Sequence, residues 1–166
     1  LNADTGEELW ATPVGVSARE GIPGEGDGPR STPAVDGAYV YVLNAYVSLS
    51  CLNANNGSVV WQRDLIAEYG GRGPDFEAAA SPLIEGDLVF VNGPAGGTGE
   101  KLLAIHKRTG HLVWEGPSAK LTHSTPVAAT IHGVRQVIFF CQSGLVSEDA
   151  KDGKLLWKRP FKFAVS

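Results

Sequence analysis

The sequence opens on the ten-residue stretch LNADTGEELW at residues 1–10, and this stretch returns three times. The later copies are LNANNGSVVW at 52–61, IHKRTGHLVW at 105–114 and EDAKDGKLLW at 148–157. In every copy a glycine stands four residues before a tryptophan, and all four tryptophans of the chain occupy this position. A period of roughly 40–50 residues built from strands is typical of the blades of a β-propeller.

Each copy also has the pattern of a β-hairpin. An apolar run leads into a tight turn that contains glycine, and a second apolar run ends at the tryptophan. The glycine supplies the positive φ of the turn without steric cost, and a buried tryptophan covers roughly 150–250 Å². We therefore predict that these residues dock one blade to another: Gly6, Trp10, Gly57, Trp61, Gly110, Trp114, Gly153 and Trp157.

The segments between the copies complete the blades. A proline opens the first strand of each repeat, where no ladder hydrogen bond has to be donated, and the first strand of a propeller blade lies innermost. These prolines are Pro33, Pro82 and Pro126. The sequence thus predicts an all-β chain, a β-propeller segment of four-stranded antiparallel blades in a single domain, 1–166. Its complete blades are 31–64, 80–115 and 124–158, with the end of a first blade at 1–14 and the start of a further one at 160–166.

The two ends of the segment predict that the chain is incomplete and that its terminal tryptophans differ in exposure from the central ones. The chain contains no methionine and opens inside a repeat, so we expect it to be part of a longer protein. Trp61 and Trp114 have complete blades on both sides and should be nearly fully buried. At least one of Trp10 and Trp157 should be more exposed, because terminal repeats leave their stacking faces bare.

Composition excludes several classes of function. The net charge of −4 gives no basic footprint for nucleic acid, and no run of 18 apolar residues is present to span a bilayer. Cys51 and Cys141 are the only cysteines, and they occupy different positions of their repeats. Two free, buried thiols or one disulfide are both compatible with this pattern, and neither a metal motif nor a haem-attachment motif is present.

The repeated motif resembles the tryptophan-docking motif of pyrroloquinoline quinone (PQQ) type repeats, Ala-x-Asp-x-x-Thr-Gly-x-x-x-Trp. The third copy matches best, with Ala104, Thr109, Gly110 and Trp114, although His106 replaces the usual Asp. The resemblance covers nearly the whole chain and implies an eight-bladed propeller, of which this segment is under half. The loop at 26–30 and the turn at 133–136 look most like alcohol dehydrogenase-like propellers of planctomycetes and related bacteria.

Within this family the resemblance leaves two kinds of function open. Quinoproteins oxidise alcohols or sugars with PQQ and calcium, and they need an aromatic floor, oxygen ligands and a carboxylate base. Here all four tryptophans are assigned to docking and no adjacent cysteine pair exists. The other branch comprises scaffolds such as the lipoprotein of the bacterial outer-membrane assembly machine, which have no cofactor.

Four polar residues precede the predicted innermost strands and could converge on one mouth of the channel: Asp27, Arg30, Glu77 and His123. They are either solvated loop residues or a ligand-binding rim. We interpret the chain as a non-catalytic binding or scaffold module with no catalytic or metal-binding residues and no cofactor in this segment. Its partners would be the remaining blades and a protein or glycan ligand, and the family resemblance places it in the periplasm or otherwise outside the cytoplasm. The alternative is a segment of a PQQ-dependent alcohol or sugar dehydrogenase.

Overall fold

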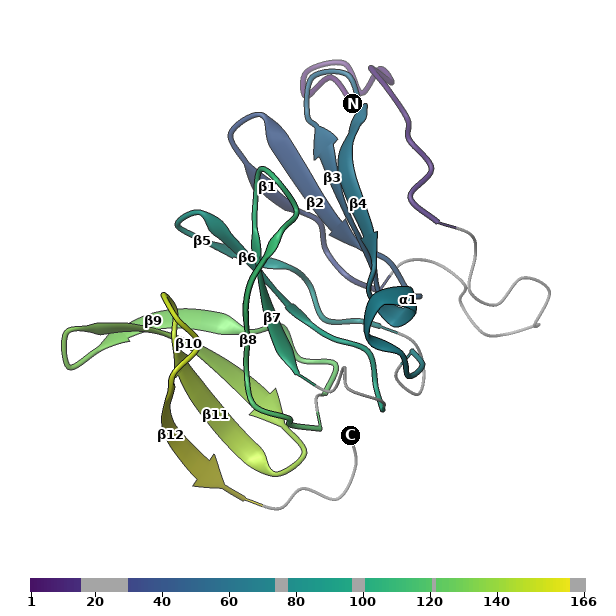
Figure 1. Ribbon diagram of the computed structural model, residues 1–166. Coiled ribbons are helices and arrows are strands. Elements are labelled where there is room, and N and C mark those ends of the chain that lie inside the picture. The colour runs from purple at the N-terminus through teal and green to yellow at the C-terminus, as the bar shows by residue number, and fades with distance from the viewer. Residues whose placement is uncertain (16–29, 74–77, 97–100, 121, 162–166) are drawn as a thin grey trace.

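Three four-stranded antiparallel sheets make up the computed structural model, which describes residues 1–15, 30–73, 78–96, 101–120 and 122–161. Each sheet follows chain order from its first strand to its last, and the sheets are arranged as successive propeller blades (Figure 1). Blade 1 contains β1 (Ala34–Asp36), β2 (Tyr39–Leu43), β3 (Ser48–Asn53) and β4 (Val59–Asp64). Blade 2 contains β5 (Leu83–Glu85), β6 (Leu88–Asn92), β7 (Leu102–His106) and β8 (Leu112–Glu115). Blade 3 contains β9 (Val127–Ile131), β10 (Val134–Cys141), β11 (Gly144–Asp149) and β12 (Leu155–Pro160).

The first strands of neighbouring blades lie beside one another. β1 contacts β5, and β5 contacts β9, as expected for the inner ring of a propeller. Residues 1–15 form a turn at 3–5 but no strand, because no described segment pairs with them. The predicted start of a further blade at 160–166 lies mostly outside the described residues, of which residue 161 is the last.

One short helix interrupts the β-structure where the sequence predicted only a loop. α1 (Leu65–Tyr69) follows β4 directly, and the carboxylate of Asp64 caps it by accepting a hydrogen bond from the amide of Ala67 at 3.0 Å. Leu65 is completely buried in the core between blades 1 and 2. No helix in the described part of the chain is long and apolar enough to cross a membrane.

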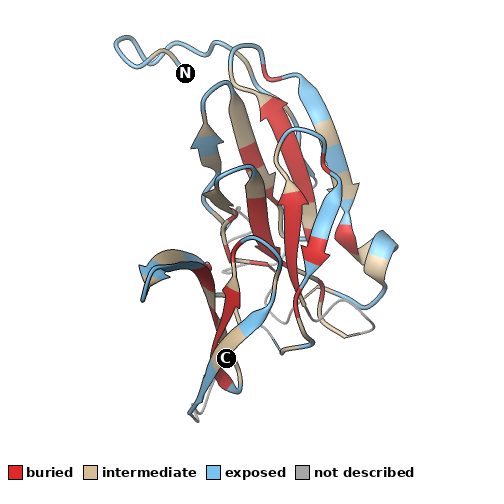
Figure 2. Cartoon of the chain, turned by 60° about the vertical axis from the view of Figure 1, so that its left-hand side comes forward, coloured by how far each residue is buried: buried red, intermediate tan, exposed pale blue. Residues whose placement is uncertain are grey.

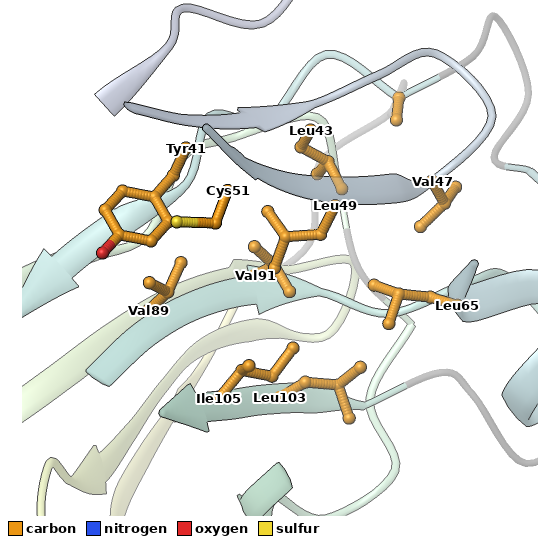
Figure 3. Packing of buried hydrophobic residues seen from close by; sticks show 11 residues of the cluster. Tyr41, Leu43, Val47, Leu49, Cys51, Leu65, Val89, Val91, Leu103 and Ile105 are labelled. Carbon is orange, nitrogen blue, oxygen red and sulfur yellow. The ribbon is translucent and has the colours of Figure 1, made fainter. Parts of the chain in front are cut away.

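Two hydrophobic cores fill the interfaces between blades. Because side chains alternate along a strand, β6 and β7 of blade 2 contribute to both cores, one on each face. Buried residues concentrate on the central strands of the blades (Figure 2). Between blades 1 and 2, residues of β2 and β3 face residues of β6 and β7 (Figure 3). The members shown there are Tyr41, Leu43, Leu49 and Cys51 on one side and Val89, Val91, Leu103 and Ile105 on the other. Between blades 2 and 3 a second core joins Phe90, Leu102, Ala104 and Trp114 to Val137, Phe139, Cys141 and Val146.

The repeated tryptophan docks onto the following blade. The Nε1 of Trp61 donates to the carbonyl of Lys107 at 2.9 Å, and its ring lies so close to Gly110 that a Cβ there would come within 2.9 Å of it. The same arrangement joins Trp10 to Ala54 and Gly57, with a hydrogen bond of 2.8 Å, and Trp114 to Ala150 and Gly153, with one of 3.3 Å. The motif glycine therefore shapes its own turn and also receives the indole of the previous repeat.

A β-bulge precedes the tryptophan in every blade. Leu52 is opposite Val59 and Cys51 is opposite Trp61, so Val60 has no counterpart in the ladder. The register shifts at the same place in blades 2 and 3, between Ala104 and Ile105 and between Ser147 and Glu148. A bulge redirects the following side chain, and here it precedes the indole that docks on the next blade.

The exposure of the tryptophans differs in part from the prediction. Trp114 is buried, with an exposed fraction of 8%, as expected. Trp61 is only partly buried, like Trp10 and Trp157, so the prediction of near-complete burial was wrong for Trp61. Trp61 borders a groove of about 410 Å³ together with Gln62 and His111, and this groove leaves part of its indole open to solvent.

Both cysteines are free and buried, which decides between the two alternatives left by the sequence. Cys51 lies in the core between blades 1 and 2, and Cys141 lies in the core between blades 2 and 3. Burial raises the pKa of the Cys141 thiol to about 11, and it also raises the pKa of Cys51.

Candidate functional site

The connections between blades enter the innermost strands on one face of the segment, which we call the rim face. Its described residues are 31–33, 78–82 and 122–126. The amide of Thr32 donates to Oγ of Ser81 at 2.8 Å, and the amide of Ser81 donates to Oγ1 of Thr125 at 2.9 Å. Each of these residues directly precedes the proline that opens its blade. The Ser/Thr-Pro pairs therefore form a directional hydrogen-bonded belt that fixes the spacing of the three rim segments.

A small cavity of about 20 Å³ lies on the rim face. It has room for about one water molecule. Blade 1 contributes Leu43 and Val47, the connection to blade 2 contributes Ala78, Ala79 and Ala80, and the remaining lining residues are Asn92, Gly93, Thr122 and His123. The cavity thus brings together segments from two blades and from two of the connections between blades.

Asn92 is the unusual residue of this cavity. It occupies the register position of Leu43 in blade 1 and of Phe140 in blade 3, where the side chains are apolar. Its Nδ2 donates to the carbonyl of Thr122 at 3.0 Å, but its Oδ1 is buried and accepts no hydrogen bond from the described residues. A buried acceptor without a partner costs free energy, so this oxygen is a candidate position for a ligand or water that donates a hydrogen bond.

Two of the four predicted rim residues, Arg30 and His123, lie among the described residues. Asp27 and Glu77 lie outside the described residues. His123 is partly buried and lines the cavity, whereas Arg30 is exposed. Ser31, the residue after Arg30, donates its hydroxyl to the carbonyl of Leu43, which borders the same cavity. The grouping of Arg30 with His123 around one site stays a prediction.

Sequence reasoning missed Asn92 and the ion pairs on the opposite face of the blades. Lys107 reaches from blade 2 to Asp36 at the end of β1, at 2.7 Å. Arg135 of blade 3 pairs with Glu85 at the equivalent end of β5, and this pair holds the pKa of Glu85 below its usual value. Asn92 had a detectable signal, because it is a polar residue at an apolar position of the repeat. The ion pairs join different repeat positions and had no comparable signal.

A quinone cofactor and calcium are what the resemblance implies for a quinoprotein, and the described residues do not fit them. Trp10, Trp61 and Trp114 dock on turns of the next blade, and Trp157 donates to Oε1 of Gln136 at 2.8 Å, so none forms a free aromatic floor. The described residues also contain no group of three or more His, Cys, Asp or Glu side chains that could hold a metal ion.

A family model described as outer membrane protein assembly factor BamB matches residues 1–164. The chain belongs to this BamB family of PQQ-type repeat propellers. The match covers all four copies of the docking motif, and the BamB-family assignment agrees with the three antiparallel blades.

Relatives of this BamB-family chain include enzymes. The quinoprotein alcohol dehydrogenase PedH of Pseudomonas putida is 25% identical over 177 residues, which covers 96% of this chain and 27% of PedH. The chain therefore spans about a quarter of the length of the curated relative it matches.

Solved structures show the same fold. BamB from Moraxella catarrhalis superposes with a TM-score of 0.61 at 18% identity, over 83% of this chain and 39% of that one. The quinohemoprotein alcohol dehydrogenase from Comamonas testosteroni gives a TM-score of 0.59 at 19% identity, over 80% of this chain and 21% of that one. At such identities the likeness concerns the propeller architecture and leaves the activity open.

Proposed function

We propose that the chain is a non-catalytic binding or scaffold module that acts outside the cytoplasm, with its ligand contact on the rim face. The observation that carries this proposal is the cavity at Asn92 and His123, where a buried acceptor has no partner in the described part of the chain, at the meeting point of two blades. The ligand would be another protein or a glycan, since both offer hydroxyl or amide donors to such an acceptor.

The rest of the rim face supports a scaffold better than a catalytic centre. Its Ser and Thr hydroxyls form the belt between blades: Ser81 and Thr125 each accept an amide hydrogen bond from the preceding blade. Thr122 donates its hydroxyl to the carbonyl of Phe140 at 2.7 Å. These groups hold neighbouring segments together, and a rigid rim of this kind suits recognition of a partner.

The location outside the cytoplasm rests on family membership. The matching family model is described as an outer membrane protein assembly factor. We propose by analogy that this chain works in the same compartment, and that the remaining blades of an eight-bladed propeller are its first partners.

Site-specific crosslinking tests the proposed contact surface. A photoactivatable amino acid is placed at His123 on the rim face in the full-length protein, and a matched copy carries it at His132. His132 is exposed in the turn between β9 and β10, at the far end of the strand that follows His123. We expect a discrete adduct in cells from position 123 and none from position 132. Equal yields, or an adduct only at position 132, would contradict the proposal.

A second candidate function is favoured by one observation, the match to PedH over nearly the whole chain. In this alternative the chain is a segment of a PQQ-dependent alcohol or sugar dehydrogenase, and the quinone site would be completed by blades beyond this chain. The two candidates differ in whether the full-length protein binds PQQ, which can be measured without knowing the substrate.

A further inference from the structure

Glu148 stands where the other repeats carry an aliphatic residue. In β11 it is opposite Val137, just as Leu52 is opposite Val40 in blade 1 and Ile105 is opposite Val89 in blade 2. Leu52 and Ile105 are buried, and so is Glu148, whose exposed fraction is 0%. A carboxyl group has therefore replaced an aliphatic side chain at the interface between blades 2 and 3.

A second difference at the same interface makes room for this carboxyl. The residue two positions after the docking tryptophan is Thr12 in the first copy and Arg63 in blade 1. Thr12 donates to the carbonyl of Gly57 at 2.6 Å, and Arg63 donates to the carbonyl of Gly110 at 3.1 Å. In blade 2 this residue is Gly116, and a Cβ there would lie 2.5 Å from Oε1 of Glu148. The carboxyl thus lies where any side chain at position 116 would begin.

The carboxyl has no hydrogen-bond partner among the residues that the structure describes. Both Oε1 and Oε2 of Glu148 are buried, and the residues of blade 2 in this core are apolar: Phe90, Leu102, Ala104 and Trp114. Two titratable groups interact with it in the described part of the chain, the ammonium of Lys158 on β12 and the thiol of Cys141 on β10. Burial raises the pKa of Glu148 to about 7, although Lys158 opposes the shift.

We propose that Glu148 makes the interface between blades 2 and 3 a proton-dependent contact, tight with a neutral carboxyl and weakened when the carboxyl ionises. An ionised carboxylate without donors cannot stay in an apolar interface at low cost. Opening this interface would let water reach the carboxylate. The docking of Trp114 is coupled to it, because its acceptor Ala150 lies two residues after Glu148 and its hydrogen bond is the longest of the three between blades, at 3.3 Å.

The equilibrium between the closed and the open interface should therefore shift toward the open form as the pH rises. A carboxyl that is protonated when closed and ionised when open releases one proton on opening. The opening equilibrium then rises by up to about tenfold per pH unit between the two pKa values and levels off above the higher one. The interface between blades 1 and 2 carries Ile105 at this position and should show no such dependence.

Hydrogen exchange measured by mass spectrometry on the full-length protein tests this proposal, after correction for the intrinsic pH dependence of amide exchange. We expect peptides from 112–116 and 144–157 to lose protection steeply from pH 5 to pH 7 and then no further. Peptides from 39–43 and 48–64 of blade 1, which contribute only to the other interface, should change little. A uniform response across both interfaces, or no response at either, would overturn the proposal.

Three variants sharpen the test. Glu148→Gln keeps the shape without the charge, and Glu148→Leu restores the residue used at position 52; both should keep protection constant from pH 5 to pH 8. Lys158→Met removes the opposing cation, so the levelling-off point should move to higher pH. Persistence of the steep pH response in Glu148→Gln, or a shift to lower pH in Lys158→Met, would contradict the assignment to this carboxyl.

Discussion

The indole of Trp61 lies against Gly110, a residue of the next blade, and donates to the carbonyl of Lys107 in the same turn at 2.9 Å. This relationship explains why glycine and tryptophan recur together although they do not contact each other within a copy. Gly57, Gly110 and Gly153 each receive the tryptophan of the preceding repeat, so the motif links consecutive repeats along the described chain.

The close approach predicts a specific cost for Gly110→Ala. A new Cβ would meet the Trp61 ring at 2.9 Å in a residue whose φ is 71°. Overpacking costs typically about 1–3 kcal/mol, in addition to roughly 1–2 kcal/mol for an L-residue in this conformation. Gly133→Ala is the matched control, because its φ is 79° and nothing lies within 4 Å of the new Cβ. Urea unfolding should show the larger loss for Gly110→Ala; equal losses would argue against the docking role.

The same motif also shows how much of this fold can be predicted from the sequence. The spacing of glycine and tryptophan identifies the hairpins and the blades, but the docking bond joins Trp61 to Lys107 across 46 residues, and spacing within a copy cannot indicate the direction. The bulge at Val60 does have a signal in the sequence, because the adjacent aliphatic residues Val59 and Val60 break the alternation of a strand. Helix α1 is only five residues long, too short for a helical period to stand out.

The candidate site was less predictable than the fold. The place of His123 before an innermost strand predicts a position on the rim, and His123 lines the cavity on the rim face. Asn92 and Glu148 were missed although each is a polar residue at an apolar position of the repeat. Glu148 begins the fourth copy of the motif, where Leu52 and Ile105 begin the second and third. Their unpartnered oxygens depend on packing between blades, which no local pattern encodes.

The belt on the rim face should contribute measurably to stability. Thr125→Val keeps the shape of the side chain but removes the acceptor for the amide of Ser81, which is 2.9 Å away. The loss should be about 1 kcal/mol, the usual net contribution of one hydrogen bond. Thr130→Val in β9 is a matched control, because its hydroxyl only accepts a 3.4 Å bond from Arg135. Chemical denaturation of both variants would contradict the belt if Thr130→Val proved the more damaging.

Glu148 should make stability depend on pH. Its pKa rises from 4.5 to about 7 on folding, so the folded protein binds more protons between these values and loses stability as the pH rises through them. At about 1.4 kcal/mol per pKa unit, Glu148→Gln should gain up to roughly 3 kcal/mol over the wild type at pH 8 and almost nothing at pH 4.5. Denaturation curves across this range provide the measurement. A pH-independent difference between the two proteins would refute the prediction.

The two thiols should be inert in the folded protein. Cys51 and Cys141 are both free and buried, and burial raises the pKa of each thiol. An aromatic disulfide reagent at pH 8 should therefore label neither residue under native conditions and both in denaturant, as read by mass spectrometry of their peptides. Reducing agent should leave the midpoint of thermal unfolding unchanged. Labelling of the native protein, or a lower midpoint on reduction, would show that the packing around these residues is wrong.

The central claim is that this propeller acts by binding a partner and not by quinone chemistry. Isothermal titration of the full-length protein with PQQ in the presence of calcium tests it most directly, with a PQQ-dependent alcohol dehydrogenase as positive control. Because all four tryptophans of this chain are engaged in structural contacts and none is left to stack on a quinone, we predict no saturable heat. Saturable binding at one PQQ per chain in the micromolar range would contradict the account and establish the dehydrogenase alternative.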